Sequence, residues 1–458
     1  MGISSGDNAM IDATPQPSAA GSALLAFRAT NARSFRDEVE LSMLSTALAD
    51  AGAVRWMAWR QGGKPVGVLP TAGIFGANAS GKSNVLRIMN DMRSHVLSSF
   101  RRTSPTSRVP RVPFLLDESA RANPSRYEVD LILDGVRHEY GFAIDDARVL
   151  EEWALRYPRG RASVIFQRDG DEINLGPSER AAGRGARSLL RPNALFLSTA
   201  AAANHRALGR MFEWFEHQMV LAEFDSRTAR QAITSRMLGD DDLGEQALGL
   251  VRVADLGIVG IKRRPIPPAV RDRIERVVRV LTDEEDADDF ELPNMDELGT
   301  QLVHRGPDGD VPMDLHVESL GTQVWFGLVG PVVHALRNGA VLLADELDAS
   351  LHPVLVHELV RLFQQPETNP RGAQLVFNAH DVTLLGDSGD RLLGRDQIWF
   401  TEKLNSGATR LYPLSDLDPR KDEAIGKRYL RGRYGGIPIV APADFDHVAE
   451  LATAGTDE

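Results

Sequence analysis

The chain has 458 residues, a formal net charge of −12, 43% hydrophobic residues and 25% charged residues, as in an ordinary globular protein. It has no cysteine, which excludes disulfides, thiolate zinc sites and cysteine nucleophiles. Its acidic charge argues against broad nonspecific affinity for DNA, and its length predicts a large domain with an inserted or attached second lobe.

Both ends of the chain are expected to be tails. Residues 1–22 are rich in Ser, Ala, Gly and Pro and lack the cationic start and apolar stretch of a signal peptide, so they predict disorder. Residues 441–458 are expected to form the C-terminal tail. No apolar run approaches the roughly 20 residues of a membrane span, so we expect a cytoplasmic protein without a membrane partner.

Strand signals dominate the first part of the chain. Residues 66–75 predict a strand that runs into a glycine-rich loop, and apolar residues at helical spacing predict a helix over 83–97. Residues 100–123 and 181–193 are expected to be loops. Two short strands are expected at 24–27 and 39–43, on either side of a polar turn at 31–36. The strands that suggest an antiparallel lobe are expected at 127–133, 138–144, 154–157 and 163–167.

The second half of the chain is expected to change from helices to alternating helix and strand. Helical patterns cover 205–238 and 270–281. From residue 319 onward helix and strand alternate, as they do in a doubly wound sheet. The sequence therefore predicts an α/β fold with a parallel doubly wound sheet, an antiparallel lobe and a helical insertion.

A glycine-rich stretch joins the predicted strand and helix. Residues 76–83, Gly-Ala-Asn-Ala-Ser-Gly-Lys-Ser, fit the P-loop pattern, in which backbone N–H groups and a helix N-terminus face the phosphates. Lys82 would contact the β- and γ-phosphates, and Ser83 would give its hydroxyl to Mg²⁺. The predicted ligands are therefore ATP and Mg²⁺. The residues expected to contact them are Gly76, Asn78, Ala79, Ser80, Gly81, Lys82 and Ser83.

An apolar strand ending in two carboxylates follows later in the chain. Residues 341–344, Val-Leu-Leu-Ala, are typical of a buried parallel strand and precede Asp345 and Glu346. Together with the P-loop, this motif predicts that Asp345 holds Mg²⁺ and that Glu346 orients and deprotonates the attacking water. For the segment 347–353 that follows, an ordinary helix entry with Ser350 or Asp348 as its N-cap is the alternative interpretation.

A histidine ends the next apolar strand. Residues 375–379 lead into His380, which lies 34 positions after Glu346. A neutral histidine there could donate a hydrogen bond to the γ-phosphate. A lone histidine at a strand end is more often structural, but its spacing from the two carboxylates favours the catalytic interpretation.

A short polar motif opens the helix expected over 322–336. Ser319-Leu320-Gly321 supplies a hydroxyl, backbone N–H groups and the positive end of a helix dipole, which suit a γ-phosphate. An ordinary helix cap is the alternative interpretation of this motif.

The order of these motifs resembles that of ABC-type ATPase heads, including SMC, RecF-like and OLD-like proteins. More narrowly, the chain is similar to stand-alone bacterial AAA-family ATP-binding proteins of phage-defence and restriction-linked loci, of the RloA-like kind. Further matching stretches are 31–36, 196–200, 318–322, 395–400 and 427–435. The resemblance implies a P-loop NTPase fold of the ABC head type over 23–200 and 300–440, with a mainly helical insertion at 201–299.

The resemblance also implies roles for individual residues. Glu346 would be the base and His380 the switch histidine, while Ser319 and Gly321 would close on ATP held by a second copy. Two features depart from the family: the signature is Ser-Leu-Gly-Thr-Gln, and no glutamine matches the Q-loop well, Gln167 included. The remaining implied residues are Lys82, Ser83 and Asp345 for phosphate and metal, and Asp348 for the nucleotide site.

Three functions compete. The first is an ATP-dependent sensor or scaffold in antiphage defence, acting as a homodimer or higher homo-oligomer with a separate effector such as a nuclease. The second is a DNA-repair or chromosome-maintenance ATPase, which would normally show a long coiled coil or a wide basic surface. The third is the engine of a transporter, which would be shorter and have a clear Q-loop. We favour the first.

The C-terminal region bears on whether the chain is itself a nuclease. Residues 416–418, Asp-Leu-Asp, have the form of a metal-binding pair, but we interpret them as a turn before Pro419. Basic and tyrosine residues alternate over 427–434. They could bind nucleic acid by stacking and charge, or form an amphipathic helix that docks on the protein's own core or on a partner, and we favour docking.

Overall fold

The computed structural model describes residues 21–49, 54–101, 104, 106–223, 226–240, 242–254, 257–264, 299–386 and 391–437. Most of the expected N-terminal tail, the whole expected C-terminal tail and the helix expected over 270–281 lie outside these residues. In the described part of the chain, no helix is long and apolar enough to cross a membrane.

A six-stranded sheet with the strand order β11-β15-β16-β5-β17-β18 forms the centre of the fold. Its first five strands run parallel, and the last pairs antiparallel with β17. Alternate side chains of β15 and β16 enter two different hydrophobic cores, so both faces of the sheet are buried, as the apolar runs predict. The strands are β11 (Met219–Ala222), β15 (Val341–Ala344), β16 (Gln374–Asn378), β5 (Thr71–Gly76), β17 (Ile398–Lys403) and β18 (Thr409–Pro413).

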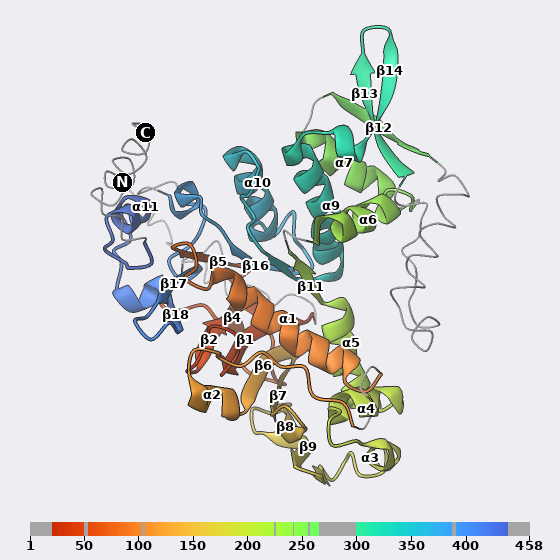
Figure 1. Ribbon diagram of the computed structural model, residues 1–458, viewed down its shortest axis with the longest axis vertical. Coiled ribbons are helices and arrows are strands. Elements are labelled where there is room, and N and C mark those ends of the chain that lie inside the picture. Colours follow the sequence, from red (N-terminus) through yellow and green to blue (C-terminus); the bar gives the residue numbers. More distant parts are fainter. Residues whose placement is uncertain are drawn as a thin grey trace, which may run out of the picture.

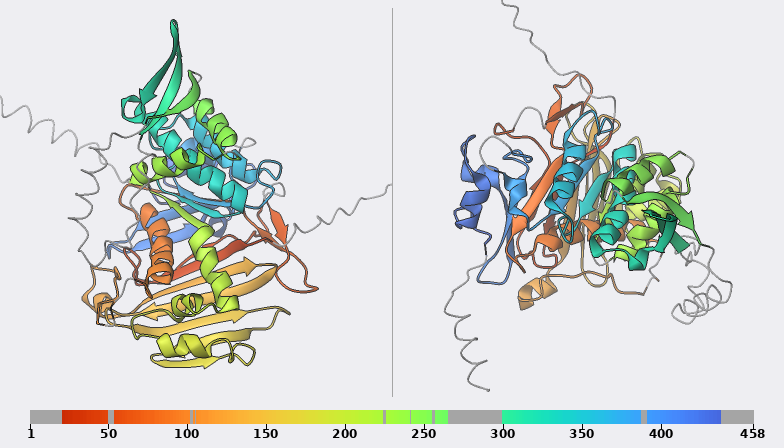
Figure 2. Two further views of the ribbon diagram at one scale, coloured as in Figure 1. Left: turned by 90° about the vertical axis from the view of Figure 1, so that its right-hand side faces the viewer. Right: turned by 90° about the horizontal axis from the view of Figure 1, so that it is seen from above.

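Helices cover both faces of this sheet (Figures 1 and 2). On one face lies α1 (Lys82–Ser98), which begins directly after the glycine-rich loop and buries its apolar stripe. The helix predicted over 83–97 is therefore confirmed. The other face is covered by α9 (Leu320–Asn338) and α10 (Pro353–Gln364).

A seven-stranded antiparallel sheet packs on the far side of α1, so that this helix lies between two sheets (Figure 2). The order of this sheet, β10-β9-β8-β7-β6-β1-β2, confirms the predicted antiparallel lobe. The helices α4 (Phe196–Ala202) and α5 (Arg206–His217) join the same core. The strands are β1 (Ala23–Thr30), β2 (Val39–Ser42), β6 (Ser125–Leu133), β7 (Val136–Ile144), β8 (Val149–Arg156), β9 (Ser163–Asp169) and β10 (Glu172–Leu175).

A helical region packs against α9. It contains α6 (Arg227–Met237) and α7 (Gly244–Ala254) and carries a three-stranded sheet at its tip (Figure 1). The strands of this sheet are β12 (Ile258–Arg263), β13 (Thr300–Gly306) and β14 (Gly309–Asp314). Residues 201–299 thus include α5, α6, α7 and β12, and also β11 of the central sheet.

Several predicted elements are wrong in detail. The mostly helical stretch expected over 205–238 holds α5 and α6, but β11 lies between them, because its four apolar residues pair with β15. The expected strand over 66–75 is two strands: β4 (Val66–Val68) pairs with β3 (Arg55–Met57), whereas β5 joins the central sheet.

Two expected loops contain short helices. The loop over 100–123 holds α2 (Glu118–Ala122), which starts there because Asp117 accepts hydrogen bonds from the N–H groups of Ser119 and Ala120. The loop over 181–193 holds α3 (Arg184–Leu189), whose one buried residue is Ala186.

Candidate functional site

The P-loop joins the end of β5 at Gly76 to the start of α1 at Lys82. Two of its residues, Ala79 at φ 61° and Gly81 at φ 102°, have left-handed backbones. A Cβ on Gly81 would lie 2.2 Å from the hydroxyl oxygen of Thr409, so glycine is required there for space as well as for conformation. No side chain caps α1, which leaves its first N–H groups to face an anion.

Lys82 is buried, with 6% of its surface exposed, and its ammonium group contacts backbone oxygen atoms of the P-loop. Its ammonium group donates hydrogen bonds to the carbonyl oxygens of Gly76 at 2.8 Å and Ala77 at 3.1 Å. Burial lowers the pKa of Lys82, while the nearby carboxylates Asp348 and Glu346, together with Asp345, oppose this shift. A phosphate group would replace the two carbonyls as a stronger, charged acceptor.

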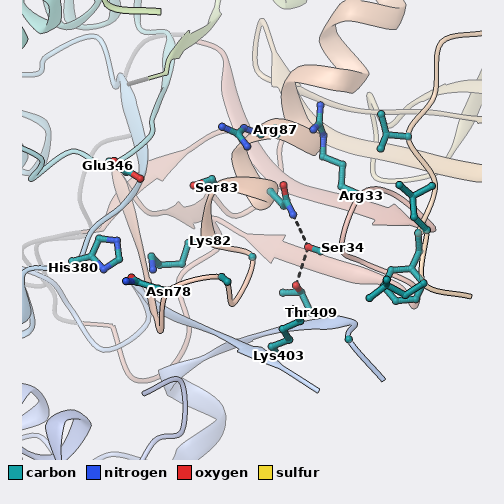
Figure 3. A pocket seen from close by; sticks show the side chains of 18 residues that line it. Arg33, Ser34, Asn78, Lys82, Ser83, Arg87, Glu346, His380, Lys403 and Thr409 are labelled. Carbon is teal, nitrogen blue, oxygen red and sulfur yellow. Dashed lines mark hydrogen bonds between the residues drawn. The ribbon is translucent and has the colours of Figure 1, made fainter. Parts of the chain in front are cut away.

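A cavity of about 770 Å³ opens in front of the P-loop (Figure 3). Its polar side is lined by Asn78, Ala79, Gly81, Lys82, Ser83 and Asn84 of the loop and helix, by Glu346 and His380, and by the cations Arg33, Arg87 and Lys403. Its apolar side is lined by Val112, Phe114, Leu115 and Leu116. A nucleotide needs both sides, because its phosphates are anionic and its base is flat and apolar on its faces.

Hydroxyl groups fix the P-loop to the neighbouring segments. The hydroxyl of Ser34 accepts hydrogen bonds from the amide of Asn84 at 2.9 Å and from the hydroxyl of Thr409 at 2.8 Å (Figure 3). Ser80, which was expected to contact the nucleotide, does not line the cavity, and its hydroxyl is hydrogen-bonded to that of Thr401 at 2.6 Å. The loop is therefore held in shape by residues from β17, β18 and the turn after β1.

Asp345 and Ser83 lie on either side of one buried amide. The side-chain nitrogen of Asn378 donates to Asp345 at 2.6 Å and lies 3.5 Å from the hydroxyl oxygen of Ser83. Carboxylate and hydroxyl oxygens are the ligands that Mg²⁺ prefers, so the residues present fit this ion. Arg87 lies 3.9 Å from the other Asp345 oxygen and pairs with Glu223 at 3.3 Å.

Glu346 and His380 reach the cavity from the ends of two adjacent parallel strands, β15 and β16 (Figure 3). Glu346 has a left-handed backbone at φ 51°, and its N–H donates to Asn378 at 2.6 Å. Lys82, Ser83, Glu346 and His380 therefore surround one space, as the motif spacing predicts.

Asp348 does not line this cavity. One of its carboxylate oxygens accepts the backbone N–H groups of His380 at 2.8 Å and Asp381 at 2.7 Å. The alternative interpretation, in which Asp348 or Ser350 caps the next helix, is wrong. The N-cap of α10 is His352, whose ring accepts a hydrogen bond from the N–H of Val354. The helix starts after His352 because Pro353 occupies its first position, where proline is favoured.

The Ser-Leu-Gly motif lies outside the P-loop cavity. Ser319 is exposed and caps α9 by accepting the N–H of Thr322 at 3.1 Å. A Cβ on Gly321 would lie 2.9 Å from the carbonyl oxygen of Ser350, so the start of α9 lies against the turn that follows Glu346.

Sequence reasoning missed two polar residues near Asp345. Asn378 ends an apolar strand, and a buried amide at that place was the available signal. Glu223 follows β11, whose last carbonyl accepts the N–H of Asp345 at 3.1 Å, and it pairs with Arg87. Gln167, by contrast, lies on β9 and does not line the cavity.

The C-terminal tyrosines are part of the core. Tyr429 and Tyr434 are 7% and 4% exposed and stack on Phe400 at ring-centroid distances of 5.3 and 5.8 Å. The docking interpretation is therefore confirmed for both rings. Residues 414–417 form a 3₁₀ helix, and the described residues hold no group of three or more His, Asp or Glu side chains that could bind a metal ion.

The family described as "AAA domain, putative AbiEii toxin, Type IV TA system" matches residues 72–386, more than half of the chain. No curated protein matches the sequence.

Solved structures with a similar fold include ATPase heads. The SMC head domain from Thermotoga maritima shares 12% identity, with 85% of this chain and 98% of that chain covered and a TM-score of 0.36. A structure titled "SmcHead bound to the C-winged helix domain of ScpA" shares 12% identity, with 86% of this chain and 99% of that chain covered and a TM-score of 0.42. The transporter component cbiO1 from Clostridium perfringens shares 11% identity, with 78% of this chain and 83% of that chain covered and a TM-score of 0.25.

Proposed function

We propose that this chain, which belongs to the family of AAA domains described as a putative AbiEii toxin of type IV toxin–antitoxin systems, binds ATP and Mg²⁺ at the P-loop cavity and hydrolyses the γ-phosphate bond. One observation carries the proposal: Lys82, Ser83, Glu346 and His380, which come from the P-loop and two different strand ends, line a single cavity. The parallel sheet and the P-loop helix are those of an ABC-head-type P-loop ATPase.

The chemistry follows from the positions of these residues. Lys82 and the first N–H groups of α1 bind the β- and γ-phosphates, and the hydroxyl of Ser83 with the carboxylate of Asp345 would hold Mg²⁺. When bound, Mg²⁺ supplies positive charge to the β- and γ-phosphate oxygens. Glu346 accepts the proton of the attacking water while the oxygen of that water bonds to the γ-phosphorus and ADP leaves. His380 donates a hydrogen bond to the γ-phosphate.

Two copies are needed for a complete site. Ser319 and Gly321 have the hydroxyl and helix start that suit a γ-phosphate, yet neither lines the cavity of its own chain. Val317 and Leu320, which flank Ser319, are 58% and 47% exposed. Apolar exposure beside a polar motif is typical of a contact surface. The start of α9 in one copy therefore closes on the ATP held by the other.

The cellular role that we favour is a sensor or scaffold in antiphage defence that passes its ATP state to a separate effector. The family description, which names a toxin of a toxin–antitoxin system, supports a role in such systems.

Glu346→Gln tests the assignment of the base. Glutamine has nearly the same shape and cannot take a proton, so we expect ATP binding to remain while phosphate release stops. ATP-bound pairs should then accumulate, and light scattering after size-exclusion chromatography with and without ATP would detect them. Normal turnover in this variant would overturn the proposal.

A further inference from the structure

We propose that Asn378 is a positioning residue that holds Asp345 and Glu346 in the arrangement needed for hydrolysis, an inference that rests on the proposed function. Asn378 is the last residue of β16 and is 0% exposed. It does not line the nucleotide cavity, so it acts through its neighbours.

The side-chain amide of Asn378 serves two residues with opposite requirements. Its nitrogen donates to the carboxylate of Asp345 at 2.6 Å, and its oxygen accepts the backbone N–H of Glu346 at 2.6 Å. A carboxylate only accepts and a backbone N–H only donates, so both neighbours require the same orientation of the amide.

The contact with Glu346 falls where the backbone needs support. Glu346 has φ 51°, in the left-handed region that residues with a side chain rarely adopt. The bond to Asn378 and the bond from Leu347 N–H to the carbonyl of Asn378 at 3.1 Å fix both sides of this turn. The turn in this form carries Glu346 to the edge of the cavity.

The contact with Asp345 sets the other half of the arrangement. The Asn378 nitrogen also lies 3.5 Å from the hydroxyl of Ser83, so a single amide spaces the two oxygen groups that would hold Mg²⁺. Asparagine carries its donor and its acceptor on two separate atoms of a planar amide. Leucine would offer neither, and threonine would place both on a single hydroxyl oxygen.

The chain offers a matched control. Asn369 is also 0% exposed, and its amide bonds to the backbone of Phe363 and Ala373 in the turn after α10. None of these residues lines the nucleotide cavity. Asn369→Leu therefore removes a buried asparagine with a purely structural role.

The experiment compares full-length wild type, Asn378→Leu, Asn378→Thr and Asn369→Leu. The affinity for ATP is measured by titrating each protein with ATP, once in the presence of EDTA and once in the presence of Mg²⁺. The kcat and KM are measured from the rate of phosphate release. Thermal unfolding is recorded for each protein.

For Asn378→Leu we expect unchanged ATP affinity in EDTA, because the P-loop contacts remain, with KM affected less than kcat. The gain in affinity from Mg²⁺ and the kcat should both fall by about 10–100-fold, as for residues that orient metal ligands. Asn378→Thr should recover part of both losses. Asn369→Leu should lower the melting temperature and leave kcat and the Mg²⁺ gain unchanged.

Wild-type kcat and Mg²⁺ gain in Asn378→Leu would overturn the inference and leave the proposed function intact. The inference would also be overturned if Asn378→Leu lost stability and ATP affinity in EDTA while Mg²⁺ still increased its ATP affinity as much as in the wild type. That result would indicate a structural role. A wild-type chain that binds no ATP would overturn the proposed function itself.

Discussion

The carboxylate of Asp348 accepts a hydrogen bond of 2.8 Å from the backbone N–H of His380. This bond ties the turn after β15, which carries Glu346, to the turn after β16, which carries His380. The same turn after β15 also touches the start of α9, because Ser350 lies against Gly321. The two proposed catalytic residues and the surface proposed to meet a second copy are thus mechanically joined.

Lys82→Ala should weaken ATP binding, because the ammonium group that contacts the phosphates is lost from a buried site. The loss of a hydrogen bond to a charged group predicts about 1.5–3 kcal/mol, or roughly 10–100-fold in affinity. Calorimetric titration of ATP measures it, with circular dichroism as the control for folding. An unchanged affinity in a folded variant would contradict the P-loop assignment.

His95 predicts an acid-sensitive fold. Burial lowers its pKa to about 4, with a small opposing effect of Asp91, and its ring lies beside those of Tyr127 and Phe142. In the unfolded chain the pKa of His95 has its ordinary value near 6.5, so between pH 6.5 and 4 the unfolded chain binds a proton at this residue and the folded chain does not. The contribution of His95 to the free energy of unfolding is therefore fully present above pH 6.5 and is lost as the pH falls toward 4.

The size of this effect can be measured by urea unfolding. We expect the free energy of unfolding to fall by about 2 kcal/mol between pH 7.5 and 5 through this residue. His95→Gln cannot titrate and should lose that share of the pH dependence. An identical pH profile in the variant would show that His95 is not the group responsible.

Nuclease activity should be absent from the purified chain. Asp416 and Asp418 lie at the end of a 3₁₀ helix, with Asp418 in a left-handed turn at φ 53°. Incubation with DNA and RNA in the presence of ATP and Mg²⁺ or Mn²⁺ should leave both polymers intact. Cleavage that disappears in Asp416→Ala would instead make this chain its own effector.

Local motifs were the predictable part of this protein. The P-loop has its own backbone requirements, such as the positive φ of Gly81, and these select residue types that the sequence displays. β15 and β16 were predictable because strands buried on both faces become continuous apolar runs. The carboxylates and the histidine follow those strands directly.

Contacts between distant segments were not predictable in the same way. β11 has four apolar residues, too few to show a strand or helix period, and only its pairing with β15 decides its conformation. Arg33 and Lys403 line the cavity from opposite ends of the chain. Asn378 has no motif of its own, because its role depends on where Asp345 and Glu346 come to lie.

Mixing two inactive variants tests the central claim most directly. Lys82→Ala damages the P-loop half of the site, while Ser319→Asp keeps the cap of α9 and sets a negative charge against the γ-phosphate. Each protein alone should hydrolyse almost no ATP. In an equimolar mixture, half of the pairs should be mixed and hold one intact site, so activity should return to about a quarter of the wild-type rate. Lys82→Ala mixed with Glu346→Gln should not recover, because both changes lie in the same half. A Lys82→Ala and Ser319→Asp mixture as inactive as its components would contradict the shared site.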